Sequence, residues 1–361
     1  MGFSRGTIAR IVALLEADIR AWVESHPKAT EADLEAELQE GMQRLGAACL
    51  GQLGHVPARG YNGLSNCHRA VQEEIVYRIL AKQAHTPVTT EYLIEAPEVA
   101  QKAQAGQFVV LRVHAQGERI PLTIADYDRE AGTITVVAQE IGRSTLMLKD
   151  LAVGDSLASF TGPLGRPTEI ENYGTVVLVG GGLGIAPIYP ICRTLREAGN
   201  HVIAIIGARN AELLFWEDKM RAVTDELIVV TDDGSYARKA LVTEPLKELL
   251  ASDRQIARVW GIGPAIMMKF ITLTTKPFGV PTIVSLNSIM VDGTGMCGAC
   301  RVSVGGRTYF ACVDGPEFDG HQVDWDLLLS RQRFYIEEER KALELYQQAA
   351  QQTQPQETSR S

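Results

Sequence analysis

Three cysteines and one aspartate near the C-terminal end of the chain have the spacing of an iron–sulfur ligand set. Asp292, Cys297 and Cys300 are separated by four and two residues, and Cys312 follows after eleven more. Plant-type [2Fe–2S] loops have this spacing, except that aspartate here takes the first cysteine's place. The glycines between them would let the loop wrap around a cluster. Zinc is the alternative, although Cys312 with Asp292 or His321 would complete such a site at an unusual spacing.

A glycine-rich turn is the second candidate for chemistry. The run 180–187 reads Gly-Gly-Gly-Leu-Gly-Ile-Ala-Pro, follows the apolar strand-like residues 175–179 and opens a helix-like segment. Glycines there allow backbone N–H groups to approach a phosphate, and a helix N-terminus adds positive potential. The spacing differs from the Gly-x-Gly-x-x-Gly fingerprint, and a purely structural turn is the alternative. The residues expected to contact a nucleotide are Gly181, Gly182, Leu183, Gly184 and Ile185.

Polar and glycine-rich turns also follow three other strand-like segments, at 207–210, 231–235 and 261–264. Ligands of open parallel sheets bind beyond the carboxyl ends of the strands. Each turn alone is typical of an ordinary chain reversal, but together they favour a nucleotide site. The candidate contacts are Arg209, Asp232, Asp233 and Gly263. Either aspartate, if it lies near the ribose, would repel a 2′-phosphate and favour NAD over NADP.

The third candidate is a strand-like run, Arg119-Ile-Pro-Leu-Thr123, followed by the turn Gly142-Arg-Ser-Thr145. Residues four apart on a strand face the same side, so Arg119 and Thr123 could together grip a phosphate. The turn would supply N–H and hydroxyl donors to a second phosphate. Taken alone, these residues indicate no more than a strand and a turn.

The composition limits what kind of protein this is. The 361 residues are 45% hydrophobic and 22% charged, with a net charge of −9, which is typical of a folded protein and disfavours nucleic-acid binding. The longest uncharged stretch, 172–192, contains five glycines and two prolines, so we expect no membrane span. Without a visible export signal, the clustered cysteines favour metal binding in a reducing cytoplasm.

The pattern of apolar residues predicts a multidomain protein with a β and an α/β part. We expect a helical extension and linker of unknown function over 1–72, and an antiparallel β-barrel over 73–170. Strands alternating with helices predict a parallel α/β domain over 171–280. The cysteine cluster lies in a small domain over 281–345, and the Gln/Thr/Ser-rich residues 346–361 are expected to be a disordered tail.

Together these motifs resemble the ferredoxin–NADP reductase superfamily with a C-terminal [2Fe–2S] domain. Within it, the chain is similar to the small subunits of NADH-dependent reduced ferredoxin:NADP oxidoreductases, also labelled sulfide/dihydroorotate dehydrogenase-like FAD/NAD-binding proteins. The likeness spans about residues 75–340. The motifs that carry it are 106–112, 117–123, the turn at 180–187, 231–235, 285–297 and 310–319.

The resemblance implies an NAD(P)H-linked oxidoreductase subunit with FAD, a [2Fe–2S] cluster and NAD(H) or NADP(H) as cofactors. By position, the FAD contacts would be Arg119, Pro121, Leu122 and Thr123, with Gly142, Ser144 and Thr145 at the pyrophosphate. The cluster ligands would be Asp292, Cys297, Cys300 and Cys312, and no catalytic acid–base side chain is required. Electrons would pass to a larger flavoprotein or iron–sulfur partner, with ferredoxin reached through that partner.

Two other functions remain open. Electron-transfer subunits of NAD-dependent dihydroorotate dehydrogenase share this architecture but carry four cysteines, so Asp292 counts against that assignment. A zinc-stabilised nucleotide-binding module without turnover is the alternative from a different class of protein. Iron with acid-labile sulfide would indicate electron transfer, and zinc would indicate the binding module.

Overall fold

The computed structural model describes residues 76–353 of the chain. These residues all belong to one compact unit, 74–361. The predicted helical extension and linker over 1–72 lie outside the described residues.

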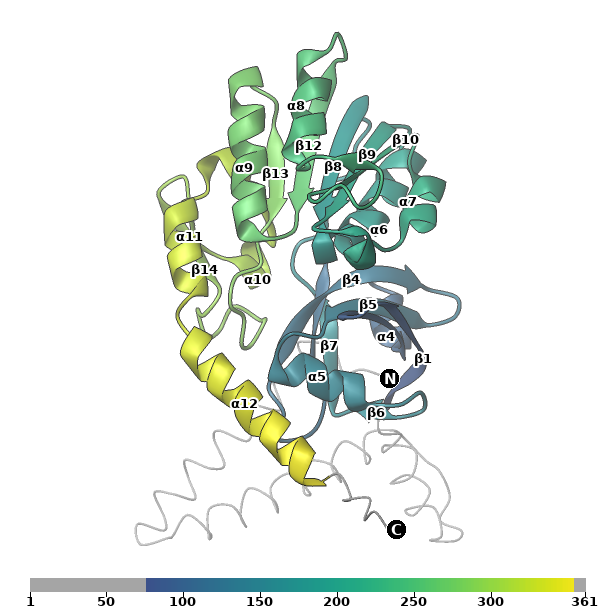
Figure 1. The fold of residues 1–361 in the computed structure, drawn as a ribbon, viewed down its shortest axis with the longest axis vertical. Helices are drawn as coiled ribbons and strands as arrows, with labels where there is room; N and C mark the ends of the chain where they lie inside the picture. The colour runs from purple at the N-terminus through teal and green to yellow at the C-terminus, as the bar shows by residue number, and fades with distance from the viewer. Residues whose placement is uncertain (1–75, 354–361) are drawn as a thin grey trace, which may run out of the picture. The chain divides into compact units, whose positions relative to one another are not determined.

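The first part of the described chain is a seven-stranded antiparallel sheet (Figure 1). Its strands are β1 (Tyr77–Thr86), β2 (Thr89–Glu95), β3 (Phe108–Arg112), β4 (Ile120–Asp128), β5 (Thr133–Gln139), β6 (Ser156–Leu157) and β7 (Ser159–Leu164). They pair in the order β6-β1-β2-β5-β4-β3-β7. Two helices, α4 (Pro97–Ala100) and α5 (Arg143–Asp150), complete it. The sheet folds around a core that includes Ile79, Ile94 and Leu111, which confirms the predicted antiparallel barrel.

The second sheet is parallel and has the order β11-β10-β9-β8-β12-β13-β16. Its strands are β8 (Thr175–Gly181), β9 (His201–Ala208), β10 (Glu226–Thr231), β11 (Arg238–Lys239), β12 (Ile256–Ile262), β13 (Thr282–Ser285) and β16 (Glu317–Asp319), of which only β16 runs antiparallel to its neighbour. Helices α6 (Ile185–Glu197), α7 (Glu217–Val223), α8 (Thr243–Ala251) and α9 (Ala265–Thr275) connect the strands. The predicted parallel α/β architecture is confirmed.

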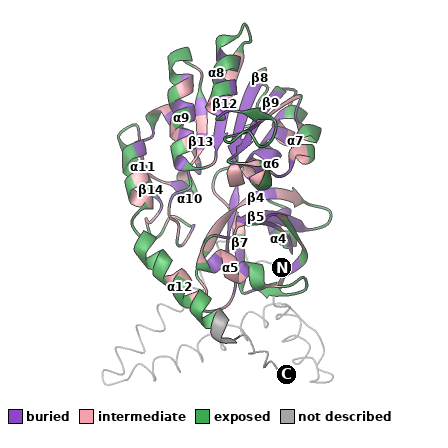
Figure 2. Cartoon of the chain, in the orientation of Figure 1, coloured by how far each residue is buried: buried purple, intermediate pink, exposed green. Residues whose placement is uncertain are grey.

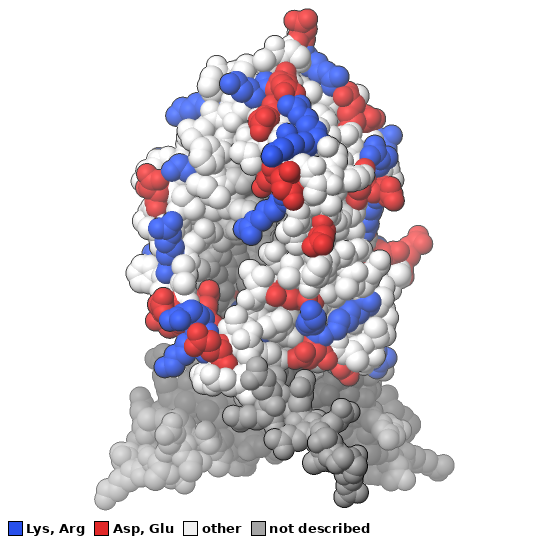
Figure 3. All heavy atoms as spheres, in the orientation of Figure 1, with Lys and Arg blue, Asp and Glu red and all other residues white. Residues whose placement is uncertain are grey.

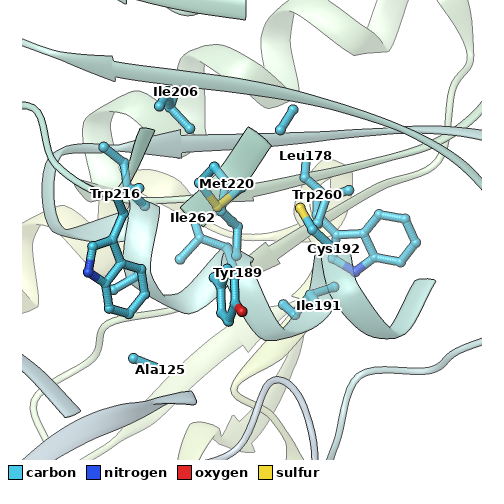
Figure 4. Close-up of a cluster of buried hydrophobic side chains, with 14 of the residues drawn as sticks. Ala125, Leu178, Tyr189, Ile191, Cys192, Ile206, Trp216, Met220, Trp260 and Ile262 are labelled. Carbon is cyan, nitrogen blue, oxygen red and sulfur yellow. The ribbon is translucent and has the colours of Figure 1, made fainter. Parts of the chain in front are cut away.

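Successive side chains of the central strands point to opposite faces of this sheet and pack in two separate cores. In β8, Leu178 packs with α6 and Met220 of α7, whereas Val179 packs with α8 and α9 on the opposite face. Figure 4 shows the first of these cores, where Cys192 of α6 lies close to Leu178 and Trp260. The central strands are therefore buried on both faces (Figure 2), as expected for a sheet covered by helices.

The barrel and the parallel sheet share a packed boundary. Ala125 of β4 joins the core formed by α6 (Figure 4), and Arg193 of α6 pairs with Asp126 of β4 at 2.7 Å. Lys219 of α7 also reaches Asp126, at 3.4 Å. The two predicted cofactor-binding parts are thus held against each other by apolar and ionic contacts.

The C-terminal part contains the small hairpin of β14 (Arg301–Val304) and β15 (Arg307–Phe310), then α10 (Ala311–Asp314), α11 (Trp325–Gln332) and α12 (Ile336–Thr353). Short 3-10 turns occur at 182–184, 211–213, 276–278 and 320–322. The domain limits stay predictions, although the parallel sheet continues through β13 and β16, beyond the expected boundary at 280.

One expectation for this end of the chain is wrong in part. Residues 346–353 belong to α12 and not to a disordered tail, and 354–361 lie outside the described residues. Glutamates in the first turn of α12 suit the positive end of a helix, and Arg340 pairs with Glu337 at 2.7 Å. The alanines and glutamines that follow have high helix propensity, which the compositional bias of the tail concealed.

Candidate functional site

The predicted FAD residues lie on β4 and at the start of α5. Arg119 immediately precedes β4, and Pro121 and Thr123 pair with Val110 and Phe108 of β3. Leu122 lies between them and packs on the edge of the barrel core. The strand pairing fixes all four positions relative to the rest of the barrel.

The turn before α5 has the geometry of a phosphate-binding helix start. Gly142 is the N-cap; its N–H donates to the Thr145 hydroxyl at 3.2 Å, and that hydroxyl donates to the Gly142 carbonyl at 3.0 Å. Ser144 and Thr145 lie in the first turn of the helix, where backbone N–H groups have no partner inside the helix. The positive end of the helix therefore lies at the residues predicted to bind the pyrophosphate.

Carboxylates already contact two of the groups predicted to bind FAD. The Ser144 hydroxyl donates to Glu118 at 2.5 Å, and the Arg119 guanidinium lies 3.6 Å from an Asp292 carboxylate oxygen. Carboxylate and phosphate oxygens are recognised by the same donors, so these contacts are compatible with the predicted binding of phosphates. Sequence reasoning did not identify Glu118, because its partner is 26 residues away.

The glycine-rich turn lies between the ends of β8 and β12, and packing explains most of its glycines. A Cβ on Gly184 would meet the Ile262 carbonyl oxygen at 2.0 Å, and a Cβ on Gly263 would lie 2.9 Å from the Gly181 oxygen. Ile185 is fully buried in the core, so its side chain is not available to a ligand, whereas Leu183 is half-buried. Gly182 differs: its φ is +54° and open space surrounds it. A ligand can approach the backbone closely at this position.

Arg209, Asp232 and Asp233 lie at the carboxyl ends of the neighbouring strands. The Asp232 N–H donates to Ala208 at 3.0 Å, and the Asp233 N–H donates to Arg209 at 3.1 Å. Desolvation raises the pKa of Asp232, although Arg209 opposes this, and hydrogen bonds from Ser235 lower the pKa of Asp233. With Gly182 and Gly263, the predicted nucleotide residues thus share one edge of the sheet, along β10, β9, β8 and β12.

Of the four predicted cluster ligands, Asp292, Cys297 and Cys300 lie along one loop, and Cys312 of α10 contacts Cys300. The Cys300 and Cys312 sulfurs are 3.2 Å apart, too far for a disulfide, and the Cys312 N–H donates to the Cys300 sulfur at 3.4 Å. Burial and the neighbouring Cys300 thiol raise the pKa of Cys312, while the Gly295 N–H opposes the rise. That contact shows that the loop bearing Asp292 and Cys297 reaches Cys312.

The loop also directs backbone donors at Cys297. N–H groups of Ala299, Asp292 and Val291 lower the pKa of this exposed thiol, which favours the thiolate form that binds metals. Gly293, Gly295 and Gly298 have φ of +83°, +85° and +66°, a conformation that only glycine adopts readily. Two sulfurs side by side, a stabilised thiolate and a loop of inward N–H groups fit a cluster with hydrogen-bonded sulfur atoms.

In residues 76–353 the side chains do not form a ready-made zinc site. Within residues 76–353, no three His, Cys, Asp or Glu side chains are arranged around a single metal position. A two-iron cluster needs four ligands spread over two metals, so this finding is compatible with the cluster. His321 instead faces Thr275, whose hydroxyl lies 3.0 Å from its ring nitrogen.

A cavity that sequence reasoning did not identify lies elsewhere, between β1 and the start of α7. It has a volume of about 540 Å³, and its walls include His85, Phe215, Trp216 and Tyr236. None of the predicted site residues lines it. The cavity is therefore separate from the predicted cofactor sites, despite its size.

Comparison with known proteins decides the family. A model of the iron–sulfur cluster binding domain of dihydroorotate dehydrogenase B matches residues 287–324. A dihydroorotate dehydrogenase B (NAD(+)) electron transfer subunit homolog from Thermotoga maritima is 50% identical over 260 residues, covering 72% of this chain and 92% of that relative. The electron transfer subunit of Desulforamulus reducens is 31% identical over 257 residues, covering 69% and 97%. The chain belongs to the dihydroorotate dehydrogenase B electron transfer subunit family.

A solved structure is similar over most of this family member. It comes from work on flavin-based electron bifurcation by the NADH-dependent reduced ferredoxin-NADP oxidoreductase. The two share 46% identity with a TM-score of 0.72, over 76% of this chain and 99% of the other. The predicted resemblance is confirmed, and the protein is an electron-transfer subunit of an oxidoreductase. In the described part of the chain, no helix has the length and apolar character needed to cross a membrane.

Proposed function

We propose that this protein moves electrons between NAD(H) and a larger flavoprotein partner, through FAD and a [2Fe–2S] cluster. The observation that carries the proposal is the contact between the two predicted sites: Asp292 of the cluster loop pairs with Arg119 beside β4. Cofactors held on either side of this contact would be neighbours. FAD would supply the exchange between hydride transfer and single-electron transfer.

The roles of the side chains follow from where they lie. Arg119, Ser144 and the N–H groups at the start of α5 would hold the FAD phosphates, in competition with the carboxylates that contact them now. Gly182 would let the nicotinamide nucleotide approach the end of β8. Asp232 would disfavour a 2′-phosphate, so we infer a preference for NADH. Asp292, Cys297, Cys300 and Cys312 would ligate the cluster.

The surface near the cluster loop suits a protein partner. Met296, which precedes the solvent-accessible Cys297, is 88% exposed, and Val291 of the same loop and Val313 of α10 are also exposed apolar residues. Apolar patches of this kind mark interaction sites. Over the face shown in Figure 3, charges of both signs are interspersed. We infer that the larger subunit covers the loop, that ferredoxin is reached through that subunit, and that the complex is cytoplasmic, where thiols stay reduced.

The test is an anaerobic titration of the reconstituted protein with NADH and then with NADPH, following flavin absorbance and the low-temperature EPR signal of the cluster together. NADH should bleach the flavin and produce a reduced [2Fe–2S] signal, and NADPH should do so less effectively. Asp232→Ala should narrow that difference, whereas the exposed Glu212→Ala should leave it unchanged. A protein without flavin and iron after reconstitution would contradict the proposal.

A second candidate is the electron-transfer subunit of a dihydroorotate dehydrogenase, favoured by the names of the relatives and by the matching iron–sulfur domain. Asp292 in the first ligand position still argues for the ferredoxin:NADP type. Purification of the native complex separates the two, because the larger subunit would oxidise dihydroorotate in one case and exchange electrons with ferredoxin and NADP(H) in the other.

A further inference from the structure

Within residues 76–353, two ion pairs connect the barrel side to the cluster segment, and one of them involves a predicted ligand. Arg119 lies 3.6 Å from Asp292, and Arg166 lies 3.5 Å from Asp314. Both arginines are largely exposed and their carboxylate partners are partly buried, so the pairs are matched in length and setting. They differ in that Arg119 is also predicted to hold FAD.

Packing fixes the position of Asp292. The next residue, Gly293, has φ of +83°, and a Cβ there would lie 2.9 Å from a Val110 methyl group and 3.0 Å from Leu164. Val110 is the register partner of Pro121, so the loop rests on the strand pair that carries the predicted flavin residues. The Asp292 carboxylate also accepts hydrogen bonds from the Thr294 N–H, at 3.1 Å, and from its hydroxyl. One carboxylate oxygen bonds Thr294, and the other faces Arg119.

We propose that Arg119 is shared between the flavin site and the cluster loop, and that it tunes the reduction potential of the cluster through Asp292. This inference rests on the proposed function. Reduction makes the cluster more negative, and a cation beside a ligating carboxylate stabilises the reduced form. Groups that contact a ligand without binding the metal orient that ligand and tune the metal. Arg119 therefore raises the potential of the cluster.

Sharing one arginine also links the two cofactors. An FAD phosphate and the Asp292 carboxylate compete for the same guanidinium, so each weakens the hold of the other. Binding linkage is reciprocal. FAD binding should lower the cluster's potential, and reduction of the cluster should weaken FAD binding. Both effects should shrink when Arg119 is replaced.

The experiment is an EPR-monitored redox titration of the full chain reconstituted with iron, sulfide and FAD, repeated after FAD is removed. Arg119→Gln should lower the midpoint potential of the cluster both with and without FAD, and Arg119→Lys should give an intermediate value. Arg166→Gln is the matched control, since it removes the same charge from the Asp314 pair, which contains no predicted ligand, and it should shift the potential less than Arg119→Gln does. Removal of FAD should raise the potential more in the wild type than in Arg119→Gln.

The outcomes distinguish a failure of this inference from a failure of the proposed function on which it rests. A wild-type protein without a [2Fe–2S] signal after reconstitution refutes the proposed function. A wild-type signal whose potential is the same in Arg119→Gln, or is shifted equally by Arg166→Gln, overturns only the role of Arg119. If Arg119→Gln does not assemble a cluster, Arg119→Lys decides, and an unchanged potential in that variant overturns the inference.

Discussion

The turn after β8 and the cluster loop are both rich in glycine, but their glycines serve different physical needs. In the turn, Gly184 gives space: a Cβ there would lie 2.0 Å from the carbonyl oxygen of Ile262 at the end of β12. In the loop, Gly293, Gly295 and Gly298 give conformation, since each has a positive φ. Only Gly182 of the turn combines a positive φ with open surroundings.

The turn thus mainly supports the structure, whereas the loop provides a binding surface. Close backbone packing at Gly184 and Gly263 holds the ends of β8 and β12 together, and any ligand would meet only the exposed part of the turn. In the loop, the unusual backbone directs N–H groups at sulfur atoms, as the lowered pKa of Cys297 indicates. Substitutions in the turn should therefore mainly lower the stability of the fold, and substitutions in the loop should mainly weaken metal binding.

The largest expected effect is at the predicted cluster site, where the loop meets α10. Cys312→Ser should abolish the cluster, because it removes one of two neighbouring sulfurs and leaves one iron without its full ligand set. Iron and acid-labile sulfide per chain measure this directly. The control is Cys192→Ala, since that thiol is fully buried in the core of the parallel sheet. Wild-type iron content in Cys312→Ser would remove this residue from the ligand set.

In the turn, the contrast is between Gly184 and Gly182. Gly184→Ala should destabilise the protein by about 3 kcal/mol or more, because its Cβ would meet the Ile262 carbonyl. Gly182→Ala should cost about 1 kcal/mol, from the positive φ alone, and should also weaken NADH binding. Denaturant unfolding and an NADH titration measure the two effects. Equal destabilisation by both substitutions would contradict the division of roles within the turn.

The sequence predicts the parts of this site that depend on local spacing. The ligand spacing at Asp292, Cys297 and Cys300 and the position of the turn after β8 could be read from neighbouring residues. Contacts between distant segments could not be. The Gly184 contact with Ile262 spans 78 residues of sequence, and the Arg119 contact with Asp292 spans 173.

The start of α7 shows the same limit. Residues 213–223 carry apolar residues at helical spacing, but α7 begins only at Glu217. The Asn210 side chain caps a short 3-10 turn instead, and Trp216 takes a φ of +60°. Its indole N–H donates to Glu91 of β2 at 3.0 Å. The helix therefore begins later than the spacing of its apolar residues indicates, next to a contact with the barrel. That contact cannot be read from the neighbouring residues in the sequence.

The third prediction concerns the junction between the barrel and the parallel sheet. Glu317 lies on β16, at the edge of the parallel sheet, and the hydroxyl of Thr168, which follows the barrel strands, donates to its carboxyl at 2.6 Å. Burial raises the pKa of Glu317 from 4.5 to about 7, against the opposing effects of Thr168, Trp260 and Arg258. The folded protein thus keeps this proton where the unfolded chain has lost it. Its contribution to stability is fully present below about pH 4.5 and is lost as the pH rises through 7.

Glu317→Gln should remove that pH dependence. The variant should gain stability relative to the wild type between pH 5 and pH 8, by at most about 3 kcal/mol. Denaturant unfolding at a series of pH values measures it, with the exposed Glu212→Gln as the control. Parallel profiles of stability against pH for Glu317→Gln and the wild type would show that Glu317 does not keep its proton in the folded protein.

The smallest expected effect distinguishes two glycines within the cluster loop. Gly295 and Gly298 both have positive φ, so alanine at either should cost about 1 kcal/mol from the backbone. A Cβ on Gly295 would also press on Val313 at 3.1 Å and shift the N–H that faces Cys312, whereas a Cβ on Gly298 would meet Phe310 at an ordinary 3.5 Å. Gly295→Ala should therefore release the cluster faster to a chelator than Gly298→Ala, at similar stability of the metal-free chain. Equal release rates would mean that positive φ alone accounts for both glycines, and that the N–H directed at Cys312 contributes little to holding the metal.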